Sequence, residues 1–201
     1  MMEELKDGFA GETAVKIKKT TKTSVICDLI EIVVTAVIVV LLVFTFFGRI
    51  AVVDGTSMTN TLHHADKLII SNLFYKPAQG DIIVCQTPFF GFEEPIVKRV
   101  IAVGGQTVRI DSENCKVYVD GKALSEDYVR KDDGGIMSDL SFYLTDSDGA
   151  YTVPEGCVFC MGDNRNVGGS WDSRDGRVGP IDVRYISGRV LCRLTPGFRF
   201  F

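Results

Sequence analysis

Three separate stretches of the chain carry residues suited to nucleophilic chemistry. The first is the polar turn at residues 55–62, in which Ser57 follows Gly55 and Thr56. A serine in such a turn can present its hydroxyl to a substrate, and neighbouring backbone N–H groups can stabilise the oxyanion that forms when the hydroxyl attacks a carbonyl. Serines in turns are common, so an ordinary surface turn is the alternative interpretation of this stretch.

The second stretch is the apolar run at residues 96–103, which is interrupted by Lys98 and Arg99. In a strand with strict alternation, Lys98 would share a face with Ile96, Val100 and Ala102. If that face is the core face, burial favours the neutral amine, which can accept a proton from a serine. The alternative is an edge strand from which Lys98 reaches water.

The third stretch, residues 162–174, concentrates acidic, amide and basic side chains directly after an apolar run. Carboxylates and guanidinium groups alternate here, which predicts a charge-assisted, hydrogen-bonded clasp. Its expected members are Asp163, Arg165, Asp172 and Arg174. A polar surface loop with ordinary salt bridges is the alternative.

A base is needed to activate Ser57, and the chain offers two histidines and Lys98. His63 and His64 follow Ser57 so closely that either would need a tight bend to reach its hydroxyl, and the residues alone do not identify the base. Only about one exposed lysine in a thousand is neutral at pH 7.4, and lowering the pKa to about 8 costs roughly 3 kcal/mol. A role for Lys98 as the base would therefore require it to be buried among apolar side chains.

The cysteines predict neither a disulfide framework nor a metal site. The chain has six of them, but its 201 residues are enough to build a core without crosslinks. Cys157 and Cys160 form a C-x-x-C within an expected strand, where a spacing of three turns the two sulfurs to opposite faces. We expect core cysteines, no metal and no other cofactor. The net charge of −4 gives no basic stripe for nucleic acid.

An apolar segment before these stretches is expected to anchor them to a membrane. Residues 32–47 are apolar except for two threonines. As a helix they span roughly 24 Å, and flanking residues extend them toward the roughly 30 Å of a bilayer core, with Arg49 reaching the headgroups. A segment that is apolar on every side does not fit a soluble helix, and no Ala-x-Ala cleavage site follows it. We expect one uncleaved transmembrane helix at residues 26–49.

The basic residues on either side of this helix predict its orientation. Four lysines precede it (Lys16, Lys18, Lys19 and Lys22), whereas only Arg49 follows it closely. The positive-inside rule then places residues 1–25 in the cytoplasm as a short tail and the remainder outside.

Residues 50–201 are expected to form an antiparallel, β-rich catalytic domain, so the fold class is mainly β with a single preceding transmembrane helix. Short apolar or alternating runs lie between turn signals, and no long stretch has an amphipathic helical period. Asp120-Gly121 between two such runs predicts a tight hairpin. Residues 125–150 are expected to form an outer loop or small subdomain. The expected strands are residues 67–71, 81–86, 96–103, 107–110, 116–119, 151–161 and 183–194.

Several blocks, in order along the chain, resemble the sequence boxes of bacterial type I signal peptidases. Residues 55–62 resemble the nucleophile box, 80–84 a structural strand box, 98–102 the lysine box, and 162–165 with 170–174 the last box, while 187–190 also fit. The resemblance implies a serine endopeptidase, a hydrolase that removes N-terminal signal peptides from exported preproteins at the outer face of the cytoplasmic membrane.

The same resemblance implies roles for individual residues. Ser57 would be the nucleophile, Lys98 the general base, and Ser170 a supporting residue that hydrogen-bonds Lys98. Structural roles would belong to Asp163, Asp172 and Arg174. Preprotein signal peptides with Ala-x-Ala cleavage sites would be the substrates, bound beside Ser57, and membrane lipid would be the other partner. The expected substrate contacts are Ile50, Val52, Val53 and Met58.

Three departures from the family pattern stand out. Asn60 occupies a position where the family usually has proline, residues 167–169 lengthen the last box, and Gly55 offers no side chain to an oxyanion. Three other functions are compatible with parts of the sequence: another Ser–Lys protease such as a self-cleaving repressor, a catalytically silent membrane-tethered β-domain, and a peptidase dedicated to one or a few substrates. The anchor before Ser57 disfavours the first, and the presence of both Ser57 and Lys98 disfavours the second.

Overall fold

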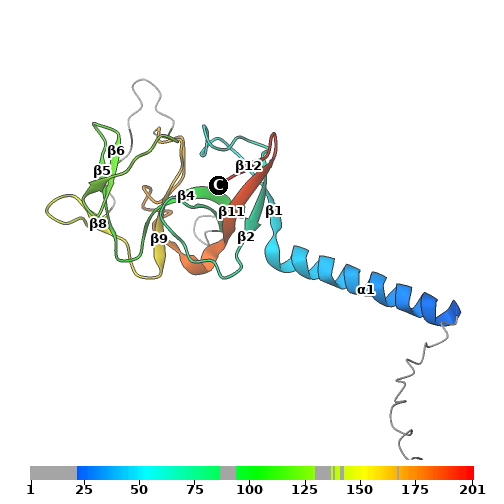
Figure 1. Ribbon diagram of the computed structural model, residues 1–201. Helices are drawn as coiled ribbons and strands as arrows, with labels where there is room; N and C mark the ends of the chain where they lie inside the picture. Colours follow the sequence, from blue (N-terminus) through cyan, green and yellow to red (C-terminus); the bar gives the residue numbers. More distant parts are fainter. Residues whose placement is uncertain (1–21, 87–93, 130–136, 138, 141–142, 167) are drawn as a thin grey trace, which may run out of the picture. The chain divides into compact units, whose positions relative to one another are not determined.

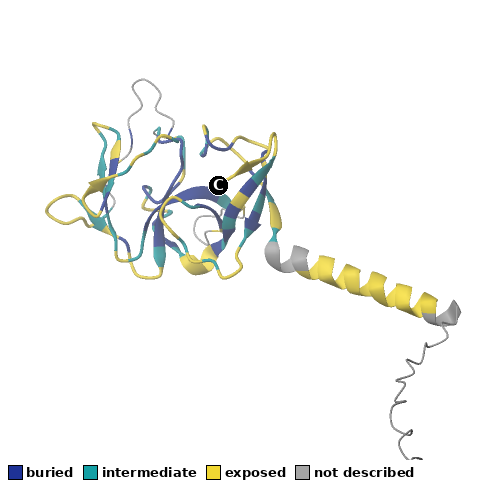
Figure 2. Cartoon of the chain, viewed as in Figure 1, coloured by how far each residue is buried: buried dark blue, intermediate teal, exposed yellow. Residues whose placement is uncertain are grey.

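The structure is a computed structural model that describes residues 22–86, 94–129, 137, 139–140, 143–166 and 168–201. The chain divides into two units, Met1–Leu41 and Leu42–Phe201. In the first, helix α1 begins at Lys22 and continues into the second unit, where it ends at Phe47. Its Val25–Leu42 segment is long and apolar enough to cross a membrane, and none of it is buried (Figure 2). The helix thus ends two residues before the expected boundary at residue 49.

The second unit contains two antiparallel sheets (Figure 1). The larger has eight strands in the order β1-β2-β11-β3-β4-β9-β10, with β12 pairing with β11. The strands are β1 (Arg49–Val52), β2 (Lys67–Ser71), β3 (Ile82–Cys85), β4 (Ile96–Val103), β9 (Cys157–Met161), β10 (Ile181–Asp182), β11 (Ile186–Thr195) and β12 (Arg199–Phe200). The smaller has four in the order β7-β6-β5-β8: β5 (Thr107–Asp111), β6 (Lys116–Val119), β7 (Lys122–Ala123) and β8 (Tyr151–Thr152). The prediction of a mainly β, antiparallel fold after one apolar helix is confirmed.

Strand β4 lies inside the larger sheet, between β3 and β9, and its six central residues are all buried. The alternative of an edge strand at Lys98 is therefore wrong. Lys98 lies opposite Ile83 of β3, on the face that also carries Val100. A register shift in the pairing of β4 with β9 separates Val100 from Ala102. Ala102 packs instead with Ile101 in a buried cluster that contains Val108 of the smaller sheet and Phe159 of the larger one. The expected strict alternation from Lys98 to Ala102 is thus broken by a bulge.

Turn residues explain where the predicted strands agree with the structure and where they do not. Asp120 and Gly121 have φ values of 50° and 76°, as the predicted β6–β7 hairpin requires. The expected strand at residues 151–161 is instead two strands, because the chain turns between β8 and β9 through Gly156 at φ 76°. The expected strand at residues 183–194 begins later, at Ile186, because Val183–Tyr185 form a 3₁₀ turn, η1. The Asp182 carboxylate caps this turn by accepting a hydrogen bond from the Arg184 N–H.

None of the six cysteines, all of which lie in the described part of the chain, forms a disulfide bond. Cys157 and Cys160 pack into different hydrophobic clusters, which confirms that their side chains leave β9 on opposite faces. Cys85, Cys160 and Cys192 are buried as expected, but Cys27 is exposed on α1, so the expectation of a core position is wrong there. Within the described ranges, no group of three or more His, Cys, Asp or Glu side chains could hold a metal ion.

Candidate active site

Lys98 and Ser57 form a direct hydrogen bond. The Lys98 Nζ lies 2.8 Å from the Ser57 Oγ and also donates to the carbonyl oxygen of Val97 at 3.0 Å. The lysine comes from the centre of β4 and is only 3% exposed. A separation of 2.8 Å between base and hydroxyl is within the range for proton transfer.

Burial lowers the pKa of Lys98 below the ordinary value for a lysine, because the charged ammonium loses its hydration in the sheet. The carboxylate of Asp172 acts in the opposite direction and favours the ammonium, whereas the positive charge of Arg174 reinforces the lowering. The lysine shares its face with Ile83, Val100 and the thiols of Cys85 and Cys160, all of them in one buried cluster. The net direction is the one that a general base requires.

The segment that carries Ser57 is fixed from both sides. Met58 and Leu62 are 1% and 0% exposed and pack beneath the turn into a buried hydrophobic cluster that also contains Val53 and Leu68. The Leu62 N–H donates to the Met58 carbonyl at 2.9 Å. From residues 162–174, called the last motif below, the Asn164 N–H donates to the Ser57 carbonyl at 2.9 Å. Asn60 adopts φ 91°, a conformation that proline cannot reach.

Gly162 permits this contact between the last motif and the nucleophile. A methyl group on Gly162 would lie 2.5 Å from the Ser57 carbonyl oxygen and 2.7 Å from the Ser170 Cβ. Neither distance leaves room for a carbon atom. The glycine is therefore a requirement of the site, and it follows directly from Met161, the last residue of β9.

A buried ion pair joins the lysine strand to the last motif. Arg99 donates from Nε and NH2 to the two carboxylate oxygens of Asp163 at 2.8 and 2.7 Å. Thr61, from the nucleophile segment, donates to the same carboxylate, and the ring of Tyr128 lies 3.9 Å from the Arg99 Cζ. The partner of Asp163 is thus Arg99, outside the predicted clasp, because β4 and β9 bring these two side chains together.

A second buried pair, Asp172–Arg174, does lie within the predicted clasp. Arg174 donates to both oxygens of Asp172 at 2.8 and 2.7 Å, and the Gly162 N–H donates to that carboxylate at 2.9 Å. Burial raises the pKa of Asp172, but the charge and hydrogen bonds of Arg174, with the Gly162 N–H, outweigh burial and leave the pKa below its usual range. Asp172 therefore stays ionised near Lys98.

Arg165 is the member of the expected clasp that pairs elsewhere. Its guanidinium binds the Glu126 carboxylate, and both side chains are almost fully buried. Its backbone carbonyl accepts from Arg174 at 2.9 Å. Glu126 lies in the segment that sequence reasoning assigned to an outer loop, where no pattern marked it as a partner of the site.

The expected hydrogen bond between Ser170 and Lys98 is absent. The Ser170 Oγ is buried, its side chain packs against Gly162, and its hydroxyl contributes to the lowered pKa of Asp172. The ammonium of Lys98 is directed to Ser57 and Val97 instead.

The four residues predicted to contact substrate fall into two groups. Ile50 and Val52 are 68% and 59% exposed on β1, which among the described strands pairs with β2 alone. Val53 and Met58 are 3% and 1% exposed, because both belong to the hydrophobic cluster beneath the turn. The structure therefore places the second pair in the floor of the site and not on its surface.

The two histidines lie apart from this arrangement. The His64 Nδ1 is 3.0 Å from the Asp54 carboxylate, and the His64 side chain is 68% exposed. His63 contributes its backbone N–H to Asp66 at 3.0 Å. Neither imidazole makes a hydrogen bond to Ser57 in the described part of the chain.

Comparison with known proteins identifies the family. The profile described as "Signal peptidase, peptidase S26" matches residues 26–195. Signal peptidase I of Bacillus amyloliquefaciens is 34% identical over 188 residues, which cover 92% of each chain. Signal peptidase I of Bacillus licheniformis is 33% identical over 92% of this chain and 93% of its own. A signal peptidase I structure from Enterococcus faecalis V583 aligns with a TM-score of 0.44 at 31% identity, over 57% of this chain and 97% of its own. The chain belongs to the signal peptidase family of serine peptidases, peptidase S26.

Proposed function

We propose that this chain is a membrane-anchored endopeptidase that removes signal peptides from exported preproteins with a Ser57–Lys98 dyad. The observation that carries the proposal is the 2.8 Å contact between the Lys98 Nζ and the Ser57 Oγ at a lysine only 3% exposed. The family match supports the substrate class, and the buried lysine supports the mechanism.

Neutral Lys98 removes the proton of the Ser57 hydroxyl as its oxygen attacks the scissile carbonyl. The backbone N–H of Ser57 stabilises the resulting oxyanion. The lysine, now protonated, transfers its proton to the leaving amine, and the peptide bond breaks to give an acyl-enzyme. Lys98 then activates a water molecule, which hydrolyses the ester and releases the product. No step uses a metal or another cofactor.

The supporting residues position this pair without touching the reacting atoms. The Arg99–Asp163 pair holds β4 against the last motif, and Asp172 with Arg174 holds the Gly162 N–H in place. Ser170 supports the site by packing against Gly162.

The substrate binds in an extended conformation along the free edge of β1, beside Ile50 and Val52. Edge strands offer unpaired backbone groups that can add a further strand. Val53 and Met58 form the apolar floor below Ser57. Family resemblance adds small residues at positions −1 and −3 of the substrate, the Ala-x-Ala pattern.

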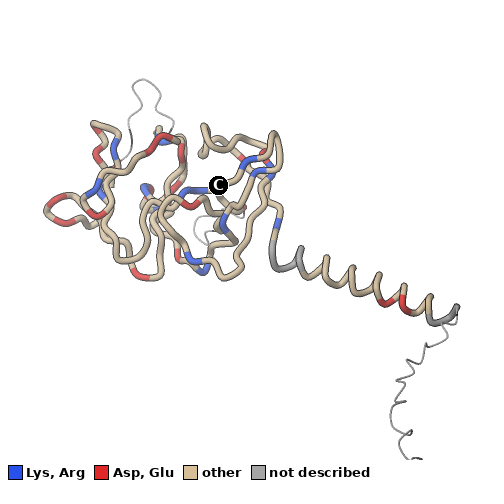
Figure 3. Tube along the Cα trace, in the orientation of Figure 1, with Lys and Arg blue, Asp and Glu red and all other residues tan. Residues whose placement is uncertain are grey.

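Helix α1 is the single membrane span, with residues 1–25 cytoplasmic and the catalytic domain, from about residue 50, on the outer side. The described part of α1 carries Asp28 and Glu31 near its beginning and no charge from there to Leu42 (Figure 3). Its apolar side chains are exposed throughout Val25–Leu42, as expected for a helix surrounded by lipid. Membrane lipid and preprotein signal peptides are the partners, and nucleic acid is not.

Cleavage of preproteins with Ala-x-Ala sites by the detergent-solubilised enzyme tests the proposal. We expect Ser57→Ala and Lys98→Ala to abolish cleavage, while a His63→Ala/His64→Ala double variant and a chelator leave it unchanged. Activity that survives Lys98→Ala would refute the dyad. A wild-type enzyme that processes only one of several preproteins would favour the dedicated peptidase.

A further inference from the structure

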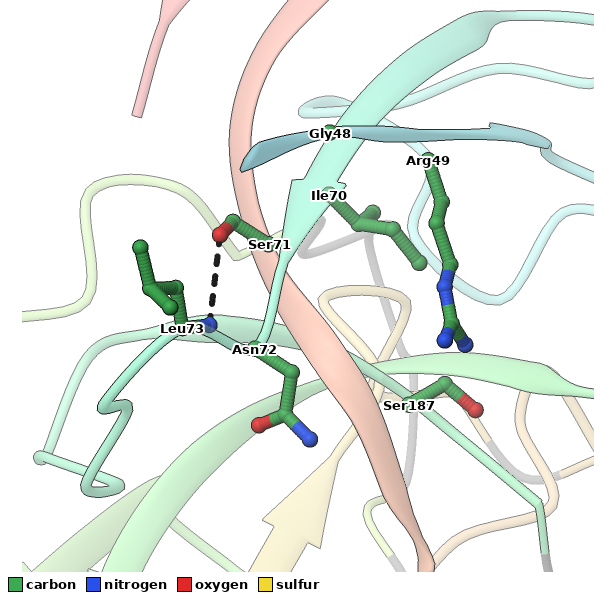
Figure 4. A pocket seen from close by; sticks show the side chains of 7 residues that line it. All are labelled: Gly48, Arg49, Ile70, Ser71, Asn72, Leu73 and Ser187. Carbon is green, nitrogen blue, oxygen red and sulfur yellow. Dashed lines mark hydrogen bonds between the residues drawn. The ribbon is translucent and has the colours of Figure 1, made fainter. Parts of the chain in front are cut away.

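A second site of a different kind lies where β1 begins. A pocket of about 200 Å³ is lined by Gly48, by Arg49 of β1, by residues 70–73 at the end of β2 and beyond it, and by Ser187 of β11 (Figure 4). None of these residues belongs to the Ser57–Lys98 site. A single water occupies about 30 Å³ of liquid volume, so the pocket has room for a larger polar group.

The polar side chains of this pocket supply hydrogen-bond donors and a positive charge. Arg49 extends from β1 toward Ser187 (Figure 4). The Ser71 Oγ accepts the Leu73 N–H at 3.3 Å and points away from Arg49, because Arg49 lies opposite Ile70, on the other face of β2 (Figure 4). Asn72 uses one amide hydrogen on the Ile186 carbonyl at 3.4 Å and retains another. No acidic residue is among the described residues that line the pocket, so its chemistry suits an anion.

An arginine with a nearby hydroxyl and amide matches one anion particularly well. The guanidinium fork can donate two parallel hydrogen bonds to the oxygens of a phosphate group, and a serine hydroxyl and an asparagine amide can bind the remaining oxygens. The apolar side chains of Ile70 and Leu73, at the wall of the same pocket, suit the carbon atoms next to a phosphodiester.

The covalent position of the pocket decides the source of the phosphate. Gly48 follows Phe47, the last residue of α1, so the pocket begins directly after the proposed membrane span. A residue at the end of a span lies in the headgroup layer, where lipid phosphates are concentrated. We propose that this pocket binds the phosphate of an anionic phospholipid, with Arg49 as the charged contact and Asn72 and Ser187 as donors. Bound lipid would then fix β1 at the membrane surface.

Retention of phosphatidylglycerol by the full chain in detergent, measured by native mass spectrometry, tests this site. We expect Arg49→Gln and the double variant Asn72→Ala/Ser187→Ala each to weaken retention about tenfold, the effect of about 1.4 kcal/mol. Arg199→Gln is the matched control, because Arg199 is an exposed arginine of the same sheet outside the pocket. Unchanged unfolding midpoints without lipid establish that each variant is folded.

Three results would overturn the proposal: equal retention in all variants, equal retention of phosphate-free diacylglycerol, or displacement of the lipid by an equal concentration of glycerol phosphate. The last would identify a site for soluble phosphates. The proposal shares the membrane-spanning helix with the proposed function but does not depend on cleavage. Ser57→Ala should retain lipid like the wild type, so failure of the lipid site and failure of the dyad are distinguishable.

Discussion

Gly162→Ala should impair catalysis without removing any reactive group. The added methyl would lie 2.5 Å from the Ser57 carbonyl oxygen, whereas ordinary contacts begin at 3.4 Å, so the backbone at the nucleophile or at Gly162 must move by roughly 1 Å. A misplacement of about 1 Å can cost about a hundredfold in rate. We therefore expect kcat/KM to fall about a hundredfold, a loss of about 2.7 kcal/mol in transition-state stabilisation.

The assay is the rate of cleavage of a soluble peptide substrate, together with thermal unfolding. Overpacking should lower the free energy of unfolding by about 1–3 kcal/mol, which leaves a folded enzyme to measure. Ser170→Gly removes the second clash, at the Ser170 Cβ, but not the clash with the Ser57 carbonyl. The double variant Gly162→Ala/Ser170→Gly should thus remain impaired relative to Ser170→Gly alone. Full activity of Gly162→Ala, or full rescue in the double variant, would refute this reasoning.

Three further predictions concern other parts of the site. Asn60→Pro, although it restores the usual family residue, should reduce activity and thermal stability because φ is 91° here and proline requires about −65°; a variant as active and stable as wild type would contradict the turn geometry. If Lys98 acts as the neutral amine, as proposed, its lowered pKa requires kcat/KM to rise with pH and reach its plateau below the ordinary lysine value of 10.5; a pH–rate profile without an ionisation in that region would count against Lys98 as base. Arg99→Met leaves Asp163 buried without its ion-pair partner and should cost about 3–5 kcal/mol of unfolding free energy in denaturant titrations. Arg184→Met, at an exposed pair, should have a much smaller effect; equal effects would show that the buried pair contributes no more than the exposed one.

Residues with local signals were predictable from the sequence. The Asp120-Gly121 hairpin follows from two residues that tolerate positive φ, and the boundaries of β2, β4 and β6 follow from short apolar or alternating runs between turn residues. The pairing of Ser57 with Lys98 was expected from chemistry, since a lysine inside an apolar run needs a reason to be there. The 2.8 Å distance between the Lys98 Nζ and the Ser57 Oγ is a property of the folded chain.

Pairings between distant segments could not be read from the sequence. Asp163 was expected to pair within the clasp of nearby residues, but strand pairing brings Arg99 to it from 64 residues away. Glu126 lies in a polar, irregular stretch without periodicity, so nothing local indicates that it binds Arg165. The position of Ser170 was also out of reach, because it depends on how residues 168–170 approach Gly162.

The burial of Lys98 also ties the chemistry of this protein to the completion of its folding. Its neutral amine depends on the β3, β4 and β9 strands being paired around it. In a chain where these strands have not yet come together, the lysine stays hydrated, and only about one molecule in a thousand carries it neutral near pH 7.4. Ser57 is then an ordinary alcohol. Under the proposed dyad, a chain whose β3, β4 and β9 strands are unpaired has no activated nucleophile, so half-folded copies would not cleave one another.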